Sequence, residues 1–393
     1  MSLMKNSIRP KYLIKESGAK GVIIKNRASD VYVEGYYPAY SASGQDVWLP
    51  EYHCDKTGIV VSAVGARCGK TFLATGKYGL CANTHLLILD TNLCYPLFMQ
   101  YTLNNEDWWL KGGSAQPFVK VKESLNQSIY FPDMNTQIRI ANFLDQKCSE
   151  IDSLSADIQS QIDILEEYKK SVIIEAVTKG LNPDVEMKDS GIEWVGMIPK
   201  HWGVHPVYRY FGERKVKNSA LKEQNLLSLS YGRIVRKDID SLGGLLPTSF
   251  NTYNIVEIGD IIIRPTDLQN DKKSLRTGLV TEHGIITSAY IDLMPKANVN
   301  SKYFHYLLHS YDVMKVFYNM GNGVRQGLNY SEFAKLMIFA PSIHEQQEIV
   351  DFLDAKCSEI DVVIADKKAQ LETLNEYKKS LIYEYVTGKK EVK

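Results

Sequence analysis

The sequence predicts an α+β protein in which two mixed α/β globular domains alternate with two long helices. The helices are expected to pair as an antiparallel coiled coil with internal pseudo-two-fold symmetry. Three observations predict this arrangement: a direct repeat, a seven-residue apolar spacing within each copy, and short strand-like segments before each copy. A chain of 393 residues is long enough for two or three domains, each with its own core.

The repeat relates Gln137–Thr178 to Gln346–Thr387 at a constant offset of 209 residues, without a gap. Across residues 136–178, 24 of 43 positions are identical in the second copy. The shared stretches include Phe-Leu-Asp, Lys-Cys-Ser-Glu-Ile-Asp and Glu-Tyr-Lys-Lys-Ser. This identity is too high for chance, so the chain contains an internal duplication.

Each copy has the pattern of one long helix. Apolar residues recur every seven positions, with one polar interruption at Lys367, and neither copy contains Pro or Gly. Pro132 and Pro341 precede the helices, and Gly180 and Gly388 follow them as stop signals. About 41 residues at 1.5 Å each form a rod of roughly 60 Å. The expected helix-pair interface comprises Leu144, Ile151, Ile158, Leu165, Val172, Leu353, Ile360, Leu374 and Leu381.

Two interpretations of the helices remain open. They can form a coiled coil between chains, as in an adaptor or scaffold protein, or pair with each other within one chain. The duplication favours the intramolecular antiparallel pair, because each helix follows its own globular segment. Gln161 and Gln370 lie at equivalent places near the middle of the helices, where a polar pair can set the register.

The globular segments are related more weakly. Gly58–Ser62 resembles residues 259–264 and predicts a buried strand, and residues 79–85 resemble residues 284–290. A Gly-x-x-Gln pattern ends at Gln116 and again at Gln326, and a helix is expected from Ser301 to Tyr318. The expected boundaries are 1–135 and 181–343 for the globular domains, with 181–200 as linker and entry, and 136–180 and 344–393 for the helices.

Charge is divided between the parts of the chain. The 46 basic and 46 acidic residues cancel overall, yet the globular residues 1–135 and 201–340 carry a net +8, and residues 136–200 and 341–393 carry a net −8. Basic modules joined by acidic helices suit a polyanion that contacts only the globular parts. Acid-rich surface helices are also common without any such partner.

Several protein classes are disfavoured by composition. No apolar run is long enough to span a membrane, and the six cysteines form no C-x-x-C pair. We therefore expect neither a disulfide framework nor a zinc site, and we expect a cytoplasmic protein. Met1–Met4 are expected to be vector-derived residues before the native start.

Enzymatic chemistry is not expected in this chain. The stretch Gly65–Thr71 resembles a phosphate-binding loop, but it has three residues between its glycines where that motif needs four. No Gly-x-Ser-x-Gly, His-Glu-x-x-His or amino-methyltransferase tetrapeptide occurs. The alternative interpretation is a turn between two glycines that carries Arg67, Lys70 and Thr71 toward a phosphate or base edge. A plain solvated turn remains equally open.

The arrangement resembles the specificity subunits of type I restriction–modification systems over nearly the whole chain. The duplicated helix carries most of the resemblance, together with Ser190–Trp202 and Gly259–Ile262, which are similar to the entry and first part of a target-recognition domain. The family's entry segment with its paired tryptophans is not seen before the first domain. The resemblance implies a non-catalytic, sequence-specific DNA-binding subunit of a DNA adenine methyltransferase and restriction complex.

The resemblance also implies how such a subunit works. Each globular domain would read one half of a bipartite site in double-stranded DNA, and the helix pair would set the gap between the halves. The helices would dock two methyltransferase subunits, which bind S-adenosylmethionine, and motor–nuclease subunits with ATP and Mg would join. No cofactor or metal is expected in this chain, and the isolated chain could self-associate. The candidate DNA-binding residues are polar residues in matched turns: Arg67, Lys70, Thr71, Asn83, His85, Gln116, Arg233, Arg264, Thr266, Lys272, Lys273, Ser288, Arg325 and Gln326.

Overall fold

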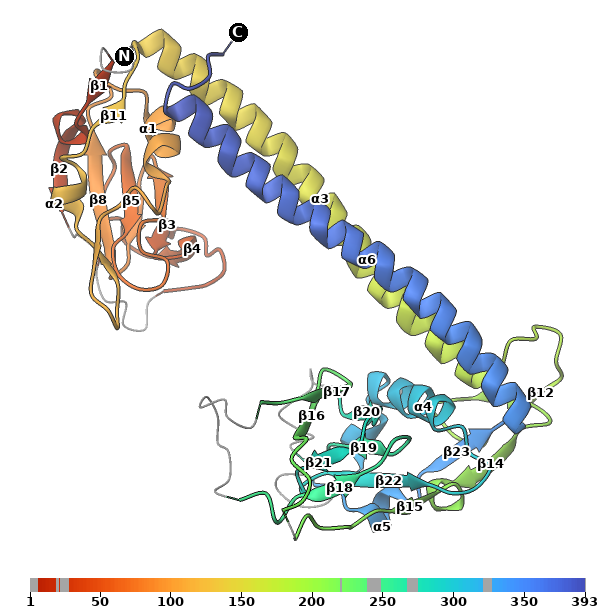
Figure 1. Cartoon of the computed structure of the whole chain (residues 1–393). Helices are drawn as coiled ribbons and strands as arrows, with labels where there is room; N and C mark the ends of the chain where they lie inside the picture. The colour runs from red at the N-terminus through yellow and green to blue at the C-terminus, as the bar shows by residue number, and fades with distance from the viewer. Residues whose placement is uncertain are drawn as a thin grey trace. The chain divides into compact units, whose positions relative to one another are not determined.

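The computed structural model describes residues 6–18, 21, 28–219, 221–238, 249–266, 275–320 and 327–392. The chain forms two units (Figure 1). Unit 1 comprises residues 1–159 and 368–393, and unit 2 comprises residues 160–367. The long helices α3 (Met134–Lys179) and α6 (Ile343–Val386) each contribute one stretch to each unit. The expected mixed α/β architecture with long helices is confirmed.

Unit 1 contains a four-stranded antiparallel sheet in the order β2 (Ile14–Gly18), β8 (Thr84–Leu89), β5 (Gly58–Ser62), β6 (Thr71–Ala74). Every residue of β5 is buried. Ile59 and Val61 pack on one face with Phe98 of α1 (Pro96–Leu103), while Val60 packs on the other face with Tyr78. Because both faces of β5 are covered, its sequence is continuously apolar instead of alternating.

Shorter elements complete unit 1. A three-stranded sheet has the order β4-β3-β7, and β1 pairs with β11 and β9 with β10. Their bounds are β1 (Ser7–Ile8), β3 (Tyr37–Ser41), β4 (Gly44–Leu49), β7 (Gly79–Leu80), β9 (Lys111–Gly112), β10 (Phe118–Val119), α2 (Val121–Ser124) and β11 (Ile129–Tyr130), with a 3-10 turn at Pro10–Leu13.

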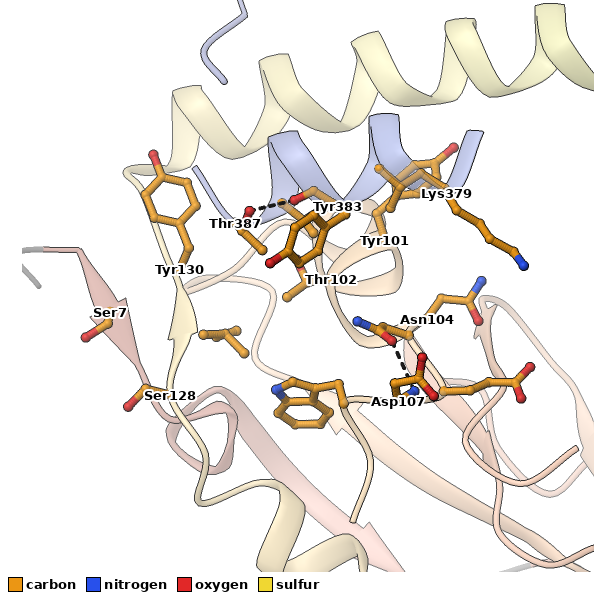
Figure 2. Close-up of a pocket in the computed structure, with 16 residues that line it drawn as sticks. Ser7, Tyr101, Thr102, Asn104, Asp107, Ser128, Tyr130, Lys379, Tyr383 and Thr387 are labelled. Carbon is orange, nitrogen blue, oxygen red and sulfur yellow. Dashed lines mark hydrogen bonds between the residues drawn. The ribbon is translucent and has the colours of Figure 1, made fainter. Parts of the chain in front are cut away.

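A pocket of about 760 Å³ opens in unit 1 between the end of α6 and the segment after α1 (Figure 2). Tyr383 of α6 and Thr387, the residue that follows α6, form one wall. Tyr101 at the end of α1 and Tyr130 of β11 form others. The lining mixes aromatic side chains such as Tyr101 and Trp108 with polar and charged ones, including Asp107 and Lys379.

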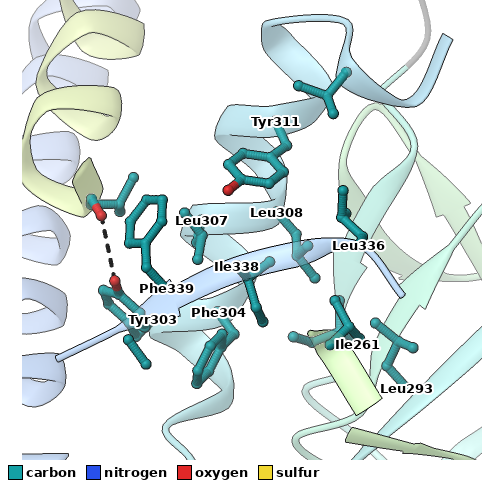
Figure 3. Packing of buried hydrophobic residues seen from close by; sticks show 14 of the residues in the cluster. Ile261, Leu293, Tyr303, Phe304, Leu307, Leu308, Tyr311, Leu336, Ile338 and Phe339 are labelled. Atoms are coloured by element: carbon teal, nitrogen blue, oxygen red, sulfur yellow. Dashed lines mark hydrogen bonds between the residues drawn. The ribbon is translucent and has the colours of Figure 1, made fainter. Parts of the chain in front are cut away.

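Unit 2 repeats the four-stranded antiparallel sheet, here in the order β15 (Phe211–Glu213), β22 (Ile291–Pro295), β19 (Ile261–Ile263), β20 (Thr277–Leu279). Ile261 and Leu293 pack with Phe304 of α4 (Ser301–Val313) on one face (Figure 3). Ile262 packs with Val256 on the other. The expected helix to Tyr318 ends earlier, because Lys315 adopts a left-handed conformation (φ +64°) before a 3-10 turn at Val316–Asn319.

The remaining pairs of unit 2 are β12–β13, β14–β23, β16–β17 and β18–β21, all antiparallel. Their bounds are β12 (Met187–Asp189), β13 (Met197–Pro199), β14 (Gly203–Pro206), β16 (Leu227–Ser230), β17 (Arg233–Arg236), β18 (Asn254–Val256), β21 (Gly284–Ile286) and β23 (Met337–Ala340). A 3-10 turn at Val207–Arg209 and the short helix α5 (Tyr330–Phe333) complete the unit.

The long helices contact each other within each unit. In unit 1, Phe143 of α3 packs against Tyr385 of α6, with ring centroids 4.7 Å apart. Asp152 accepts hydrogen bonds from Lys378 Nζ at 2.5 and 2.7 Å. In unit 2, Lys169 Nζ donates to Asp361 at 2.6 and 2.7 Å.

The residues of the expected helix-pair interface differ in burial. Leu144, Ile151, Ile158, Leu353, Ile360 and Leu381 are buried, while Leu165, Val172 and Leu374 are half-buried. The polar interruption at Lys367 has a partner, because its Nζ donates to Gln161 Oε1 at 2.5 Å. Four residues spaced four positions after the heptad series are also buried, namely Cys148, Ile162, Cys357 and Ile364. The seven-residue spacing alone missed this second row, which the three-and-four spacing of helical faces predicts.

A buried glutamine connects each sheet's helix to the long helix that follows it. In unit 1, Gln137 Nε2 donates to Pro132 O at 2.8 Å, and Tyr95 N–H donates to Gln137 Oε1 at 2.9 Å. In unit 2, Gln346 Nε2 donates to Pro341 O at 3.0 Å. Asn300 N–H donates to Gln346 Oε1 at 3.1 Å. Tyr95 and Asn300 are the N-cap residues of α1 and α4.

Within the described ranges, no helix is long and apolar enough to cross a membrane.

We expect Gln137→Leu to lower the free energy of unfolding by about 2 kcal/mol, because it leaves the Tyr95 N–H and the Pro132 carbonyl buried without partners. Gln146→Leu is the matched control, since Gln146 is exposed on the same helix and donates to the exposed Glu150. Its cost should stay within about 0.5 kcal/mol. Denaturant unfolding measures both, and equal losses would contradict the role of Gln137.

Candidate DNA interface

One edge of the four-stranded sheet in unit 1 gathers three loops. Strand β5 ends at Ser62, while β6 begins at Thr71 and β8 at Thr84, so their connections meet at this edge. Backbone hydrogen bonds hold the loops together. Ala63 N–H donates to Asn83 O, and Gly65 N–H donates to Pro117 O, both at 2.8 Å.

Four of the residues expected to bind DNA lie together at this edge with exposed side chains: Arg67, Lys70, Asn83 and Gln116. The turn that carries the two basic residues depends on Gly69, which has φ +99°. A Cβ at Gly69 would lie 3.2 Å from Glu106 Cα, so a side chain there would crowd the neighbouring loop. Asn83 itself is left-handed (φ +68°), a conformation that asparagine tolerates.

Two further expected residues of unit 1 behave differently. Thr71 is 1% exposed because it begins β6 and pairs with Val61, so the expectation that it reaches DNA from a turn is corrected. His85 is half-buried, and its Nε2 lies 2.8 Å from Ser17 Oγ. Burial, together with the nearby charge of Lys122, lowers the pKa of His85. The imidazole is therefore neutral at pH 7 and can act by hydrogen bonding.

The corresponding edge of unit 2 is built in the same way. Strand β19 ends at Ile263, and β20 and β22 begin beside it. Arg264 N–H donates to Arg276 O at 2.8 Å, and Leu328 N–H donates to Pro265 O at 3.0 Å. Thr266 and Ser288 are exposed there, and Arg264 is half-buried. The other expected residues of these loops, Lys272, Lys273, Arg325 and Gln326, lie outside the described residues.

A buried arginine that the sequence analysis missed supports this second edge. The Arg276 residue is fully buried, and its Nη1 donates to Thr266 O at 2.6 Å. Its backbone N–H donates to Asp312, and its guanidinium lies 5.1 Å from the Tyr318 ring centroid. Arg276 therefore positions the backbone after β19. Its sequence context gave no signal that separates a structural arginine from a DNA-binding one.

The β16–β17 hairpin adds a second basic element to the edge of unit 2. Its tip, Tyr231–Gly232, is left-handed at both residues. A Cβ at Gly232 would lie 3.0 Å from Leu275 Cδ1, which places the tip beside the start of β20. Arg233 is exposed next to it, and Tyr231 is 87% exposed. The sequence analysis chose Arg233 but not Tyr231, although a tyrosine before a turn glycine was visible.

Two buried carboxyl groups lie in the sheet region of unit 2, Asp260 just before β19 and Asp292 within β22. Asp260 accepts a hydrogen bond from Arg214 Nε at 2.6 Å. Asp292 is buried beside it, and neither of its oxygens has a hydrogen-bond partner among the described side chains. Burial and the negative charge of Asp260 raise the pKa of Asp292 well above the usual range of a carboxyl group.

Comparison with known proteins gives the family. The family model described as type I restriction modification DNA specificity domain matches residues 16–163 and 251–373, more than half of the chain. The protein belongs to this family of type I restriction–modification specificity subunits.

Within the described ranges, no group of three or more His, Cys, Asp or Glu side chains is arranged to hold a metal ion.

Individual relatives agree with this assignment. The type I restriction enzyme MjaVIII specificity subunit of Methanocaldococcus jannaschii is 24% identical over 93% of this chain and 88% of its own length. The putative type I restriction enzyme MjaX specificity subunit of the same organism is 27% identical over 83% of this chain and 76% of its own length. A solved chain from work on assembly and conformational transition of the type I R-M system shares the fold. Its TM-score is 0.68 at 11% identity, over 99% of both chains.

We expect Asp292 to make the stability of unit 2 depend on pH. Its folded pKa exceeds the unfolded value, so its contribution is fully present below the unfolded pKa and is lost as pH rises through the folded pKa. Asp292→Asn should remove this loss, so its unfolding midpoint should fall less than that of the unsubstituted protein between about pH 5 and pH 9. Calorimetry across this range, with exposed Asp238→Asn as control, checks the sign.

Charge removal at the edge of unit 1 should weaken DNA binding. We expect Arg67→Ala with Lys70→Ala to lower the affinity for duplex DNA about tenfold or more and to reduce the slope of log K against log salt by about two. Lys77→Ala is the control, because Lys77 is exposed in the turn between β6 and β7, away from this edge. Equal salt slopes in all three proteins would contradict the assigned interface.

Proposed function

We propose that the chain reads a bipartite, asymmetric DNA site, with one half-site for the loop edge of each unit. The observation that carries this proposal is that both units have the same arrangement of sheet, loop edge and buried glutamine. The same four-stranded sheet ends in a polar loop edge in both units, and an equivalent buried glutamine fastens each unit's α1 or α4 to its long helix. The target-recognition domains correspond to residues 1–135 and 181–343, and the spacers to residues 136–180 and 344–393.

Recognition at these edges follows from the available side chains. Arg and Lys pair best with guanine in the major groove, and Asn and Gln with adenine. In unit 1, Arg67 or Lys70 would contact guanine or phosphate, and Asn83 or Gln116 would contact adenine. In unit 2, Arg233, Arg264, Thr266 and Ser288 fill the equivalent roles.

We also propose that α3 and α6 form an antiparallel coiled coil with pseudo-two-fold symmetry. The ion pairs support it. The offset of 209 relates Asp152 to Asp361 and Lys169 to Lys378, and Lys169 bonds to Asp361 just as Lys378 bonds to Asp152. Such reciprocal pairing is the mark of a two-fold interface. The pair would act as a spacer that fixes the gap between the half-sites.

The chemistry would belong to partner subunits. The acidic outer faces of α3 and α6 suit protein partners better than phosphate, so we assign them to two methyltransferase subunits that carry S-adenosylmethionine. The adenine to be methylated would be flipped into a pocket of that partner. Motor–nuclease subunits with ATP and Mg would join for cleavage, and this chain would supply recognition without catalysis.

A methylome tests the proposal directly. The chain is co-expressed with its cognate methyltransferase in a methylation-free host, and modified adenines are located by single-molecule sequencing. We expect one split motif with a fixed gap. Replacing residues 190–340 with the corresponding part of another specificity subunit should change one half of the motif only.

Each alternative result has a defined meaning. A change in both halves would contradict the modular assignment of half-sites to units. Absence of modified adenine from a complex shown to assemble, together with salt-independent DNA binding, would favour a coiled-coil adaptor without DNA specificity.

A further inference from the structure

The strand beside each loop edge is the last strand of its sheet. β6 ends the order β2-β8-β5-β6 in unit 1, and β20 ends the order β15-β22-β19-β20 in unit 2. Both strands begin with a buried threonine, Thr71 in β6 and Thr277 in β20. Each threonine is therefore the point at which a loop of the edge joins the sheet.

The two strand starts have the same register. Ser62 N–H donates to Lys70 O in unit 1, and Arg264 N–H donates to Arg276 O in unit 2, both at 2.8 Å. In an antiparallel ladder the next residue turns its backbone N–H and C=O away from the neighbouring strand. That residue is the threonine in both units. Because it is buried, its two backbone groups need partners from another element.

Helix α1 supplies both partners in unit 1. Gln100 Nε2 donates to Thr71 O at 2.7 Å, and Thr71 N–H donates to Asn104 Oδ1 at 3.2 Å. Gln100 lies in α1, and Asn104 is its C-cap residue, four positions later and on the same side of the helix. One helix therefore holds both backbone groups of Thr71.

Helix α4 holds the start of β20 with different side chains. His305 lies five positions after the N-cap residue of α4, as Gln100 does in α1, and it is hydrogen-bonded to the Thr277 backbone. Asp312, buried near the end of α4, accepts a hydrogen bond from Arg276 N–H. The contact between helix and strand is thus repeated in the two units, although the residues that make it differ.

The same two helices are also bonded to the long helices. Tyr101 OH donates to Asp145 Oδ1 at 3.4 Å in unit 1, and Tyr306 OH donates to Asp354 Oδ1 at 2.9 Å in unit 2. Each tyrosine directly follows the residue that bonds to the threonine carbonyl or backbone. Each of α1 and α4 therefore connects its long helix to the start of the strand beside the loop edge.

Base recognition depends on this connection more than phosphate contact does. Lys70 directly precedes Thr71, and Arg67 lies in the same turn, because Lys70 N–H donates to Arg67 O at 3.2 Å. A side chain that reads a base edge must be held to within about 0.5 Å. A charge that contacts phosphate keeps most of its interaction after such a shift, because Coulomb energy falls only as the inverse of distance.

We propose that Gln100 and Asn104 are positioning residues for base recognition by unit 1, and that His305 and Asp312 have this role in unit 2. They hold the start of the strand and act on DNA through the loop residues that precede it. The inference rests on the proposed function, since it requires each loop edge to read one half-site.

Discrimination between base pairs tests the proposal. The full chain, assembled with its cognate methyltransferase, is titrated with its methylome-defined duplex and with two duplexes that each carry one changed base pair, one in each half-site. We expect Gln100→Met to lower discrimination about fivefold or more in the unit 1 half-site only, and His305→Met to do so in the unit 2 half-site only. The slope of log K against log salt should stay unchanged, because no phosphate contact is removed.

A matched control separates positioning from stability. Gln127 Nε2 donates to Trp108 O at 2.8 Å, a bond of the same kind in unit 1 that involves neither α1 nor β6. Gln127→Met should cost similar stability, measured by denaturant unfolding, and leave discrimination unchanged. Asn104→Asp keeps the acceptor for Thr71 N–H and should retain the discrimination that Asn104→Leu loses.

The outcomes are distinguishable. Unchanged discrimination in Gln100→Met and Asn104→Leu would overturn the positioning role, and so would an equal loss in Gln127→Met. An unsubstituted complex that binds all three duplexes equally would overturn the proposed function, and the positioning role with it.

Discussion

A buried glutamine at the start of each long helix is the constraint on which each unit depends. Gln137 and Gln346 use both ends of their amides. The Nε2 group donates to a proline carbonyl, and the Oε1 atom accepts from the backbone N–H of the N-cap residue of α1 or α4. Burial makes these bonds costly to break. They therefore fix how α1 and α4, and the sheets packed on them, are oriented against α3 and α6. This contact therefore also sets where the loop edge of each sheet lies relative to the long helix that begins in the same unit.

The helices could be predicted from sequence because their signals are local and repeated. Heptad spacing, flanking prolines and terminal glycines placed α3 and α6 to within a few residues of their ends. Strand β5 was also predictable, since Gly58–Ser62 is continuously apolar. The length of α4 was not, because its end depends on the left-handed backbone at Lys315, and lysine carries no signal for that conformation.

The loop edges were predictable only in outline. Matching the repeats selected loops that lie at one edge of each sheet, and exposed residues such as Arg67 and Asn83 lie in them. Burial within a loop depends on strand register, which the sequence does not display. Thr71 is therefore buried as the first residue of β6, and Arg276 is buried and donates to the Thr266 carbonyl. Tyr231 was missed because tyrosines are common in this chain, with 24 in all.

The two long helices also carry two equivalent thiols, Cys148 in unit 1 and Cys357 in unit 2. Both are buried, and burial raises the pKa of each thiol. Because the thiolate is the reactive form, alkylation at neutral pH requires local separation of the helices. The alkylation rate of each cysteine therefore reports separation of the helices in its own unit. Labelling rates at the two cysteines would distinguish helix separation in unit 1 from helix separation in unit 2.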